Sequence, residues 1–295
     1  MSVEIRLNWS ASVPVSCLYA AECVVRNLPL ADSAIGEALA EPAAHLQEAL
    51  LEEYVPLETF WSHVVPLAAN FPGQLELATI ALTKTVGRPK AEVLAGRFRG
   101  LLVDVRNAYT RAVPESGEAL AARIEPLRQA WNDRGTGLLP RMVNWTEPEI
   151  IVEEATVCLV HPILAGGGTG YLPYNLAVIE AVAADPAPEL PEVLRLAWML
   201  STLNLDLPRY SEHIQHQRVA LVAALAMIPV AVTAAADIRV IAAAADAIGR
   251  AVQAWTKPPD KTEEWTRALE QWWGTYSTMR PPWATALKGL DVLLS

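Results

Sequence analysis

The stretch 165–171, Ala-Gly-Gly-Gly-Thr-Gly-Tyr, has the composition best suited to ligand binding. Glycine-rich turns between a strand and a helix present backbone N–H groups to phosphates. The spacing departs from the dinucleotide-binding pattern, because Tyr171 stands where a third glycine is needed, and the stretch contains no Gly-Lys-Ser/Thr of a P-loop. We therefore expect a mobile surface loop, with Gly167 and Gly168 as candidate ligand-binding residues.

Two histidines and a glutamate lie close together in the sequence: Glu212, His213 and His216. On a helix, Glu212 and His216 would share a face. Zinc needs three or four ligands, and a third from His161 or Cys158 depends on the fold. The spacing is not the His-Glu-x-x-His of metallopeptidases. We expect a solvated helix end, no metal and no cofactor, and retain His161, Glu212 and His216 as candidate ligand-binding residues.

Nucleophilic chemistry finds little support in the sequence. There is no Gly-x-Ser-x-Gly turn of the α/β-hydrolase type. Cys158 lies in an apolar run, where burial raises a thiol pKa and limits access. Glu153 and Glu154 would point to opposite faces of a strand, so they do not form an acid–base pair. The sequence favours a non-catalytic protein and predicts no catalytic residue.

The charge balance bears on partners. The chain has 33 acidic and 23 basic residues, a net charge of −10, which disfavours nucleic-acid binding. The only basic stretch, 84–141, has eleven bases and six acids, and the acidic stretch 32–58 is available to pair with it. We therefore expect neither nucleic acid nor a membrane as a partner.

Two further features indicate a cytoplasmic protein. The three cysteines have no Cys-x-x-Cys spacing, and the first residues lack a basic region followed by an apolar one, so no secretory signal is expected. The segment 219–236 is uncharged and long enough to span a membrane. Its eight alanines and the central Pro229 favour a buried core helix instead.

The elements that must position these residues follow from periodicity. A 52% hydrophobic content indicates a substantial core. Alternation predicts a strand over 3–9, and apolar or 3–4 spacing predicts helices over 13–25, 88–113 and 118–131. A further helix is expected over 32–53, with Asp32 as N-cap and an interruption near Pro42. Gly135 fits the position just after the helix over 118–131.

The middle of the chain changes in character. Residues 149–160 are β-branched and apolar, which predicts one or two strands that end at His161. We expect another strand over 176–182 and a helix from Pro191 to about residue 204. Glu180 and Arg195 border the glycine loop in this arrangement, so both are candidate ligand-binding residues.

The last third reads as helical. Apolar residues from Ile238 through Ala245 to Trp255 follow 3–4 spacing and predict one helix. A final helix carries an aromatic stripe: Trp265, Leu269, Trp272 and Tyr276. We expect this aromatic face to cover the protein's own core. The alternative is that Trp273, on the flank of the stripe, stays exposed and contributes a surface for a partner or a second copy of the chain.

The order of elements resembles that of gluzincin-type zinc peptidases over about residues 150–216. In that family a strand pair and a small edge strand precede an active-site helix that carries His-Glu-x-x-His. Here the corresponding segment is Leu194-Arg195-Leu196-Ala197-Trp198, which keeps the Leu-Ala centre but lacks both histidines and the glutamate. The resemblance thus implies a relative without zinc chemistry at this helix.

We conclude that the fold is mainly α with a small β element (α+β): a helical N-terminal half, strands near 150–182 and a helical C-terminal third. Two lobes, 1–141 and 142–295, or one continuous core, are expected. The predicted function is a non-catalytic interaction or scaffold module. The alternatives are a catalytically inactive relative of a zinc metallopeptidase, or an enzyme with a pocket around loop 165–175.

Overall fold

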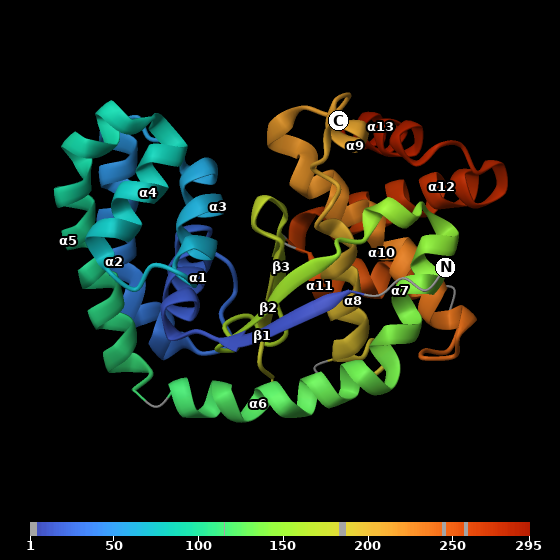
Figure 1. The fold of residues 1–295 in the computed structure, drawn as a ribbon, viewed down its shortest axis with the longest axis horizontal. Helices are drawn as coiled ribbons and strands as arrows, with labels where there is room; N and C mark the ends of the chain where they lie inside the picture. Colours follow the sequence, from blue (N-terminus) through green and yellow to red (C-terminus); the bar gives the residue numbers. More distant parts are fainter. Residues whose placement is uncertain (1–4, 115, 183–186, 244–245, 257–258) are drawn as a thin grey trace. The chain divides into compact units, whose positions relative to one another are not determined.

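The structure is a computed structural model, and it describes residues 5–114, 116–182, 187–243, 246–256 and 259–295. It is mainly helical with one four-stranded sheet, as predicted (Figure 1). The strands are β1 (Arg6–Ala11), β2 (Glu154–Val160), β3 (Gly168–Tyr171) and β4 (Leu176–Glu180). The helices of the first half are α1 (Val13–Val25), α2 (Ser33–Glu52), α3 (Leu57–Leu67), α4 (Gln74–Val86), α5 (Arg88–Ala112), α6 (Ser116–Ala130) and α7 (Thr136–Trp145). Those of the second half are α8 (Glu192–Thr202), α9 (Pro208–Ser211), α10 (Val219–Asp237), α11 (Ala247–Trp255), α12 (Thr262–Met279) and α13 (Trp283–Leu293).

The chain divides into two compact units. One comprises Ser10–Arg123 and Cys158–Ala165, and the other Met1–Trp9, Ile124–Val157 and Gly166–Ser295. The predicted lobes, 1–141 and 142–295, were each continuous in sequence, whereas the units combine separate segments. The boundaries between the units fall within β1 and β2, so each of these strands contributes residues to both units.

Local sequence signals set the helix ends of the first unit. The Ser12 hydroxyl accepts the N–H of Val15 at 3.2 Å, and the Asp32 carboxylate accepts that of Ala34 at 2.9 Å. These side chains satisfy donors that the first turns of α1 and α2 leave without a helical partner. The predicted helices over 13–25, 32–53 and 88–113 are confirmed to within a residue at each end. The interruption expected near Pro42 was wrong, because α2 continues through this residue.

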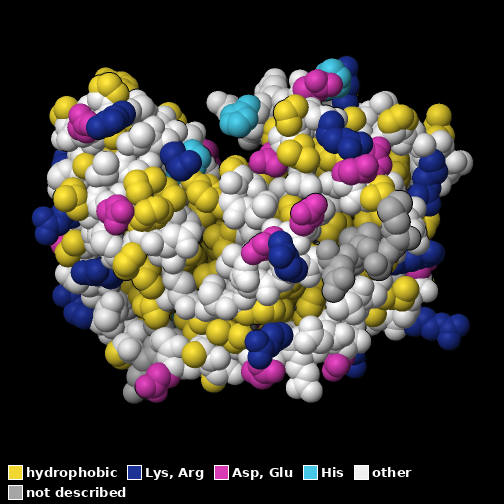
Figure 2. Space-filling view, viewed as in Figure 1, with side chains coloured by type: hydrophobic (Ala, Val, Ile, Leu, Met, Phe, Trp, Pro, Cys, Tyr) yellow, Lys and Arg dark blue, Asp and Glu magenta, His cyan; other side chains and the backbone are white. Residues whose placement is uncertain are grey.

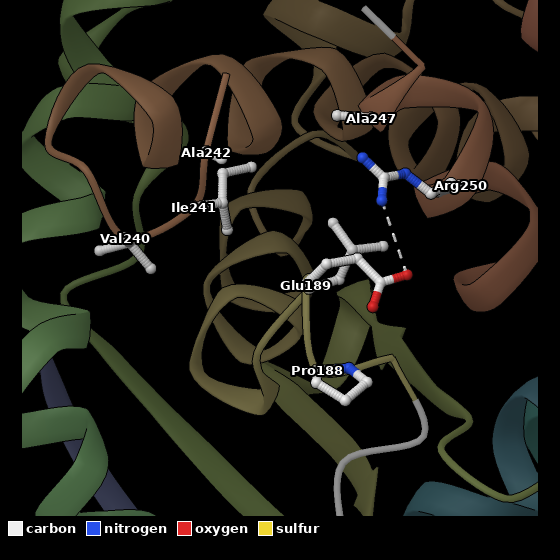
Figure 3. A pocket seen from close by; sticks show the side chains of 8 residues that line it. Pro188, Glu189, Val240, Ile241, Ala242, Ala247 and Arg250 are labelled. Atoms are coloured by element: carbon white, nitrogen blue, oxygen red, sulfur yellow. Dashed lines mark ion pairs between the residues drawn. The ribbon is translucent and has the colours of Figure 1, made fainter. Parts of the chain in front are cut away.

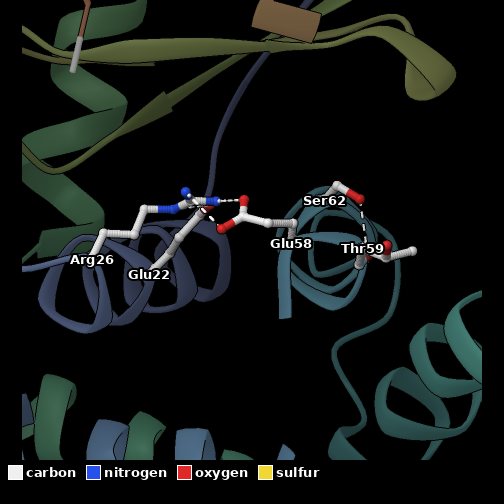
Figure 4. A network of polar contacts seen from close by, with 5 residues as sticks. All are labelled: Glu22, Arg26, Glu58, Thr59 and Ser62. Atoms are coloured by element: carbon white, nitrogen blue, oxygen red, sulfur yellow. Dashed lines mark hydrogen bonds and ion pairs between the residues drawn. The ribbon is translucent and has the colours of Figure 1, made fainter. Parts of the chain in front are cut away.

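An arginine ties the end of α1 to the start of α3 (Figure 4). Arg26 donates through Nη1 and Nη2 to the two carboxylate oxygens of Glu58, at 3.1 and 2.5 Å, and through Nε to Glu22 at 3.0 Å. Burial lowers the pKa of Arg26, but the carboxylates of Glu22 and Glu58 together raise it above its usual value. The two parallel bonds give a bidentate arginine–carboxylate contact between the end of α1 and the start of α3.

The basic stretch pairs with the acidic one inside this unit, as expected. Arg97 of α5 forms ion pairs with Glu52 and Glu53 at the end of α2, at 2.5 and 3.0 Å, and Lys90 donates to the carbonyl of Glu53. On the face drawn in Figure 2, basic and acidic side chains are interspersed. The cations of α5 therefore help to join two helices of the unit.

A π-helical turn, Trp131–Gly135, connects α6 directly to α7. The prediction that Gly135 ends the helix was therefore wrong. A Cβ on Gly135 would overlap the ring of Trp131, so this position needs glycine for the close approach of the ring. Glycine occurs both at helix ends and at close contacts within helices, and the sequence alone does not distinguish the two.

The sheet has the order β1-β2-β4-β3. β1 runs parallel to β2, because Arg6 N–H donates to the Glu153 carbonyl and Ser12 N–H to the Leu159 carbonyl, in the same register. β3 pairs antiparallel with β4, with Gly168 opposite Ile179 and Tyr171 opposite Leu176. β3 and β1 are therefore the two edges of the sheet. Residues 168–171 form a strand instead of belonging wholly to a loop.

α8 and α10 form the core of the second unit. Every α8 residue from Val193 to Thr202 is buried, and the helix packs against β3, β4 and α10. His216–Asp237 is the single described stretch long and apolar enough to cross a membrane, and 72% of its 18-residue apolar window is buried in the protein. This burial confirms the expected core helix.

The C-terminal helices differ from the prediction in two respects. α10 ends at Asp237 and α11 begins at Ala247, so 238–255 is not one helix, and Ile238 is 38% exposed. Ala245 lies outside the described residues. In α12 the aromatic stripe is buried as expected, but Trp273 is only 8% exposed and packs 5.3 Å from the ring of Trp145. The alternative of an exposed partner surface at Trp273 is therefore wrong, and the aromatic face covers the core.

Candidate functional site at the glycine loop and edge strand β3

A buried carboxylate at the end of β4 organises the glycine loop. Glu180 is completely buried, and its Oε2 accepts the backbone N–H groups of Gly166 and Gly167 at 2.8 and 2.9 Å. Ala165 and Gly166 have positive φ angles of 56° and 118°. Successive N–H groups in such a turn form a concave anion site. In this protein, the anion at that site is the side chain of Glu180.

An arginine from α8 holds the same end of β4. Arg195 is 3% exposed, and its Nη2 donates to the backbone carbonyl of Glu180 at 3.2 Å. The same atom lies 3.4 Å from a carboxylate oxygen of Glu192, one turn earlier in α8. A buried charge is tolerated when it is paired and hydrogen-bonded, and here both conditions are met. Arg195 therefore anchors the sheet to α8.

The structure brings together four of the residues singled out in the sequence: Gly167, Gly168, Glu180 and Arg195. His161 belongs to the other unit, where its backbone N–H donates to the Ser16 hydroxyl at 3.1 Å. The region expected to form a pocket is therefore a hydrogen-bonded loop at the end of a strand. Its acidic and basic side chains, Glu180 and Arg195, bind backbone atoms of the protein.

The histidine segment is not the predicted helix. α9 ends at Ser211, and His216 starts a separate 3-10 turn, so Glu212 and His216 do not share a helix face. His213 lies 3.4 Å from the Glu212 carboxylate, and both side chains are more than half exposed. Within the described part of the chain, no group of three or more His, Cys, Asp or Glu side chains is placed to hold a metal ion.

Burial keeps the cysteine side chains in the protonated thiol form. All three are buried as free thiols. Burial raises the pKa of the Cys17 thiol to about 12 and that of Cys158 to about 11, against a usual value of 9.0. The thiolate, which is the nucleophile, is thus disfavoured at neutral pH.

The outer edge of β3 was not predicted from the sequence. Glu180 N–H donates to the Gly167 carbonyl at 3.2 Å, which marks 167 and 180 as a hydrogen-bonded pair. Because such pairs alternate in an antiparallel ladder, the N–H and C=O groups of Gly168 and Gly170 point away from β4. Among the residues that the structure describes, these outward groups have no hydrogen-bond partner.

The glycines of β3 are required by close contacts with β4 and α8. A Cβ on Gly168 would lie 2.7 Å from the carbonyl oxygen of Val178 and 2.9 Å from the sulfur of Met199, and one on Gly170 would lie 2.6 Å from the Thr202 hydroxyl. Glycine at every second position therefore lets the strand lie directly on the helix. The alternation Gly168-Thr-Gly170 was the signal available in the sequence, but it is also typical of a loop.

The two edges of the sheet differ in chemistry. β1 carries Arg6, which forms an ion pair with Glu154 of β2 at 3.0 Å. β3 consists of Gly-Thr-Gly-Tyr, without charge or proline, and Thr169 is exposed. Proteins usually protect an exposed edge with charges, prolines or covering segments, because it can pair with another strand. β3 has neither charged residues nor prolines.

Comparison of the chain with protein-family models, with curated proteins and with solved structures finds no match.

Proposed function

We propose that the chain is a non-catalytic interaction module that binds an extended polypeptide segment along β3. The proposal rests on the N–H and C=O groups of Gly168 and Gly170, which point away from β4. An extended segment added to a sheet edge gains main-chain hydrogen bonds from such groups, while side chains set specificity. We place this activity in the cytoplasm, as the sequence indicates.

The rigid support of β3 favours this function. Glu180 holds the loop before the strand through two backbone N–H groups, and Arg195 holds the end of β4. α8 lies in contact with the glycines of β3. An edge held in one conformation loses less entropy when a ligand binds than a flexible one does.

The resemblance to gluzincin-type peptidases supports a compatible second proposal, an inactive relative of that family. The observation in its favour is the order β2, antiparallel edge strand β3, β4 and then the buried helix α8. In the segment of α8 that takes the place of the peptidase motif, position 195 holds an arginine that donates to the backbone carbonyl of Glu180. Elemental analysis of the purified protein tests this proposal: one zinc per chain would contradict it.

Binding is tested with an array of short peptides and the full chain. We expect peptides that bind in extended form, and N-methylation at alternate ligand residues should abolish binding, because it removes the donors that pair with the strand. Lysine at an edge opposes strand addition, so Thr169→Lys should weaken binding at least about tenfold.

The matched control is Thr169→Ser, which keeps the small polar side chain and should bind like the parent. Unfolding of both variants should match that of the parent, because Thr169 is exposed. The proposal fails if no peptide binds, or if N-methylation and Thr169→Lys leave binding unchanged.

A further inference from the structure

A second feature of the same unit is independent of β3: a cavity of about 280 Å³ beside the start of α11 (Figure 3). Apolar side chains of Pro188, Leu190, Val240 and Ile241 form part of its wall, and Ala247 of α11 is also in the lining. The volume lies just below the range of ordinary small-molecule sites, so the cavity fits a compact ligand.

One side of the cavity is polar. Figure 3 shows Arg250 and Glu189 facing each other across it, with their nearest charged atoms 3.8 Å apart. A charge-assisted hydrogen bond is shorter, about 2.7–2.9 Å, so neither group saturates the other. The guanidinium Nη1 of Arg250 and the carboxylate of Glu189 therefore keep donor and acceptor capacity on this wall, and their side chains are 37% and 46% exposed.

The helix end adds donors to the same wall. Ala247 is the first residue of α11, and the side chain of the N-cap residue Asp246 makes no capping hydrogen bond. The N-terminus of a helix carries a partial positive charge and unsatisfied N–H groups. Arg250 and this helix end together favour an acceptor oxygen on the ligand.

The charged side chains beside the cavity determine which charge the ligand can carry. Asp246 also pairs with Arg250, at 3.1 Å, so Glu189, Asp246 and Arg250 together carry one net negative charge. A lone carboxylate is therefore disfavoured as a ligand, and Glu189 is available for a protonated amine. The apolar wall fits an aliphatic body.

We infer that this cavity binds a small ligand with a protonated α-amine next to a carbonyl oxygen on an aliphatic body. The amine contacts Glu189, the oxygen contacts Arg250 and the start of α11, and the aliphatic part packs on Val240 and Ile241. A free aliphatic amino acid and the amino-terminal residue of a peptide share this chemistry.

Calorimetric titration of the full chain with four probes tests the inference: L-leucinamide, L-leucine, isoamylamine and isovalerate. We expect leucinamide to bind at millimolar concentration. Isoamylamine, which lacks the oxygen, and isovalerate, which lacks the amine, should bind at least about tenfold more weakly. Binding of leucinamide without leucine assigns the site to peptide amino termini, and binding of both extends it to free amino acids.

Variants separate the site from non-specific effects. Glu189→Gln and Arg250→Gln should each weaken leucinamide binding at least about tenfold, whereas Glu212→Gln, at an exposed carboxylate elsewhere, should not. Ala247→Leu fills the cavity and should abolish binding without a change in charge. The inference is overturned if leucinamide does not bind at about 10 mM, if isoamylamine or isovalerate binds as tightly, or if the cavity variants bind normally while folded.

Discussion

The backbone N–H of Gly167 donates to the buried Oε2 of Glu180 at 2.9 Å. A glycine-rich turn that could have cradled a phosphate is thus filled by a carboxylate of the same chain. The bond links the start of β3 to the end of β4, and it changes the role of the glycines from ligand binding to support of the edge strand. Under our proposal, this support prepares β3 for the addition of another strand.

Removal of the Glu180 carboxylate should destabilise the protein. In Glu180→Ala the N–H groups of Gly166 and Gly167 lose their buried acceptor, at an expected cost of about 2–4 kcal/mol in the free energy of unfolding. Glu180→Gln keeps an acceptor oxygen and should cost less. Urea denaturation measures both, with Glu212→Ala as an exposed control expected within about 0.5 kcal/mol of the parent. Parent-like unfolding of Glu180→Ala would show that the two bonds are not important.

Trp272 and Trp273 should both act as core residues. Trp272 donates its indole N–H to the Ala286 carbonyl at 2.8 Å, and Trp273 packs on Trp145. Truncation to alanine should lower the free energy of unfolding by about 3–5 kcal/mol in each case. Tyr54→Ala, at a side chain 88% exposed, is the control and should unfold like the parent. A Trp273→Ala variant with unchanged stability would restore the exposed position that the sequence suggested.

The π-helical turn predicts a reversal of helix propensity. Alanine normally stabilises a helix relative to glycine by about 1 kcal/mol, and Gly100→Ala in α5, where a Cβ meets nothing within 4 Å, should follow that rule. Gly135→Ala should destabilise instead, because its Cβ would overlap Trp131. Thermal unfolding of the two variants measures the difference in sign. Stabilisation by both would contradict the close packing at Gly135.

Alkaline pH should destabilise the fold through its buried thiols. The folded-state pKa of Cys17 is raised by burial to about 12, while an unfolded thiol titrates near 9.0. Above pH 9 the unfolded chain therefore binds fewer protons than the folded one, and stability falls with rising pH by at most about 1.4 kcal/mol per unit for this group. Denaturation between pH 8 and 11 in a reducing agent should show a shallower decline for Cys17→Ala. An identical decline in that variant would exclude this contribution.

Helices with clear local signals were predictable. Val13–Val25 and Ser33–Glu52 were expected from apolar spacing and from the capping residue Asp32, and both signals act within one turn of the chain. The break between α10 and α11 was not expected, because residues from Ile238 onward keep helical spacing. Arg239 adopts a left-handed φ of 60° just after α10, a backbone choice that apolar spacing does not report.

The site was predictable in composition but not in arrangement. Gly167, Glu180 and Arg195 were candidates from the sequence, yet their bonds depend on the register of β3 and β4 and on the packing of α8. Glu212 and His216 were equally good candidates from the sequence. They do not share a helix face, because α9 ends at Ser211, before both residues. Residue type identifies groups capable of chemistry, while long-range pairing decides whether they bind a ligand or the backbone.

Hydrogen exchange at β3 measures strand addition at the edge of the sheet. The amides of Gly168 and Gly170, which point away from β4, should exchange rapidly in the free protein, whereas the amide of Thr169, paired with Val178, should exchange slowly. Saturation with the tightest-binding peptide should slow exchange at Gly168 and Gly170 and leave Thr169 unchanged. Rapid exchange of both glycine amides in the saturated complex would contradict strand addition at β3.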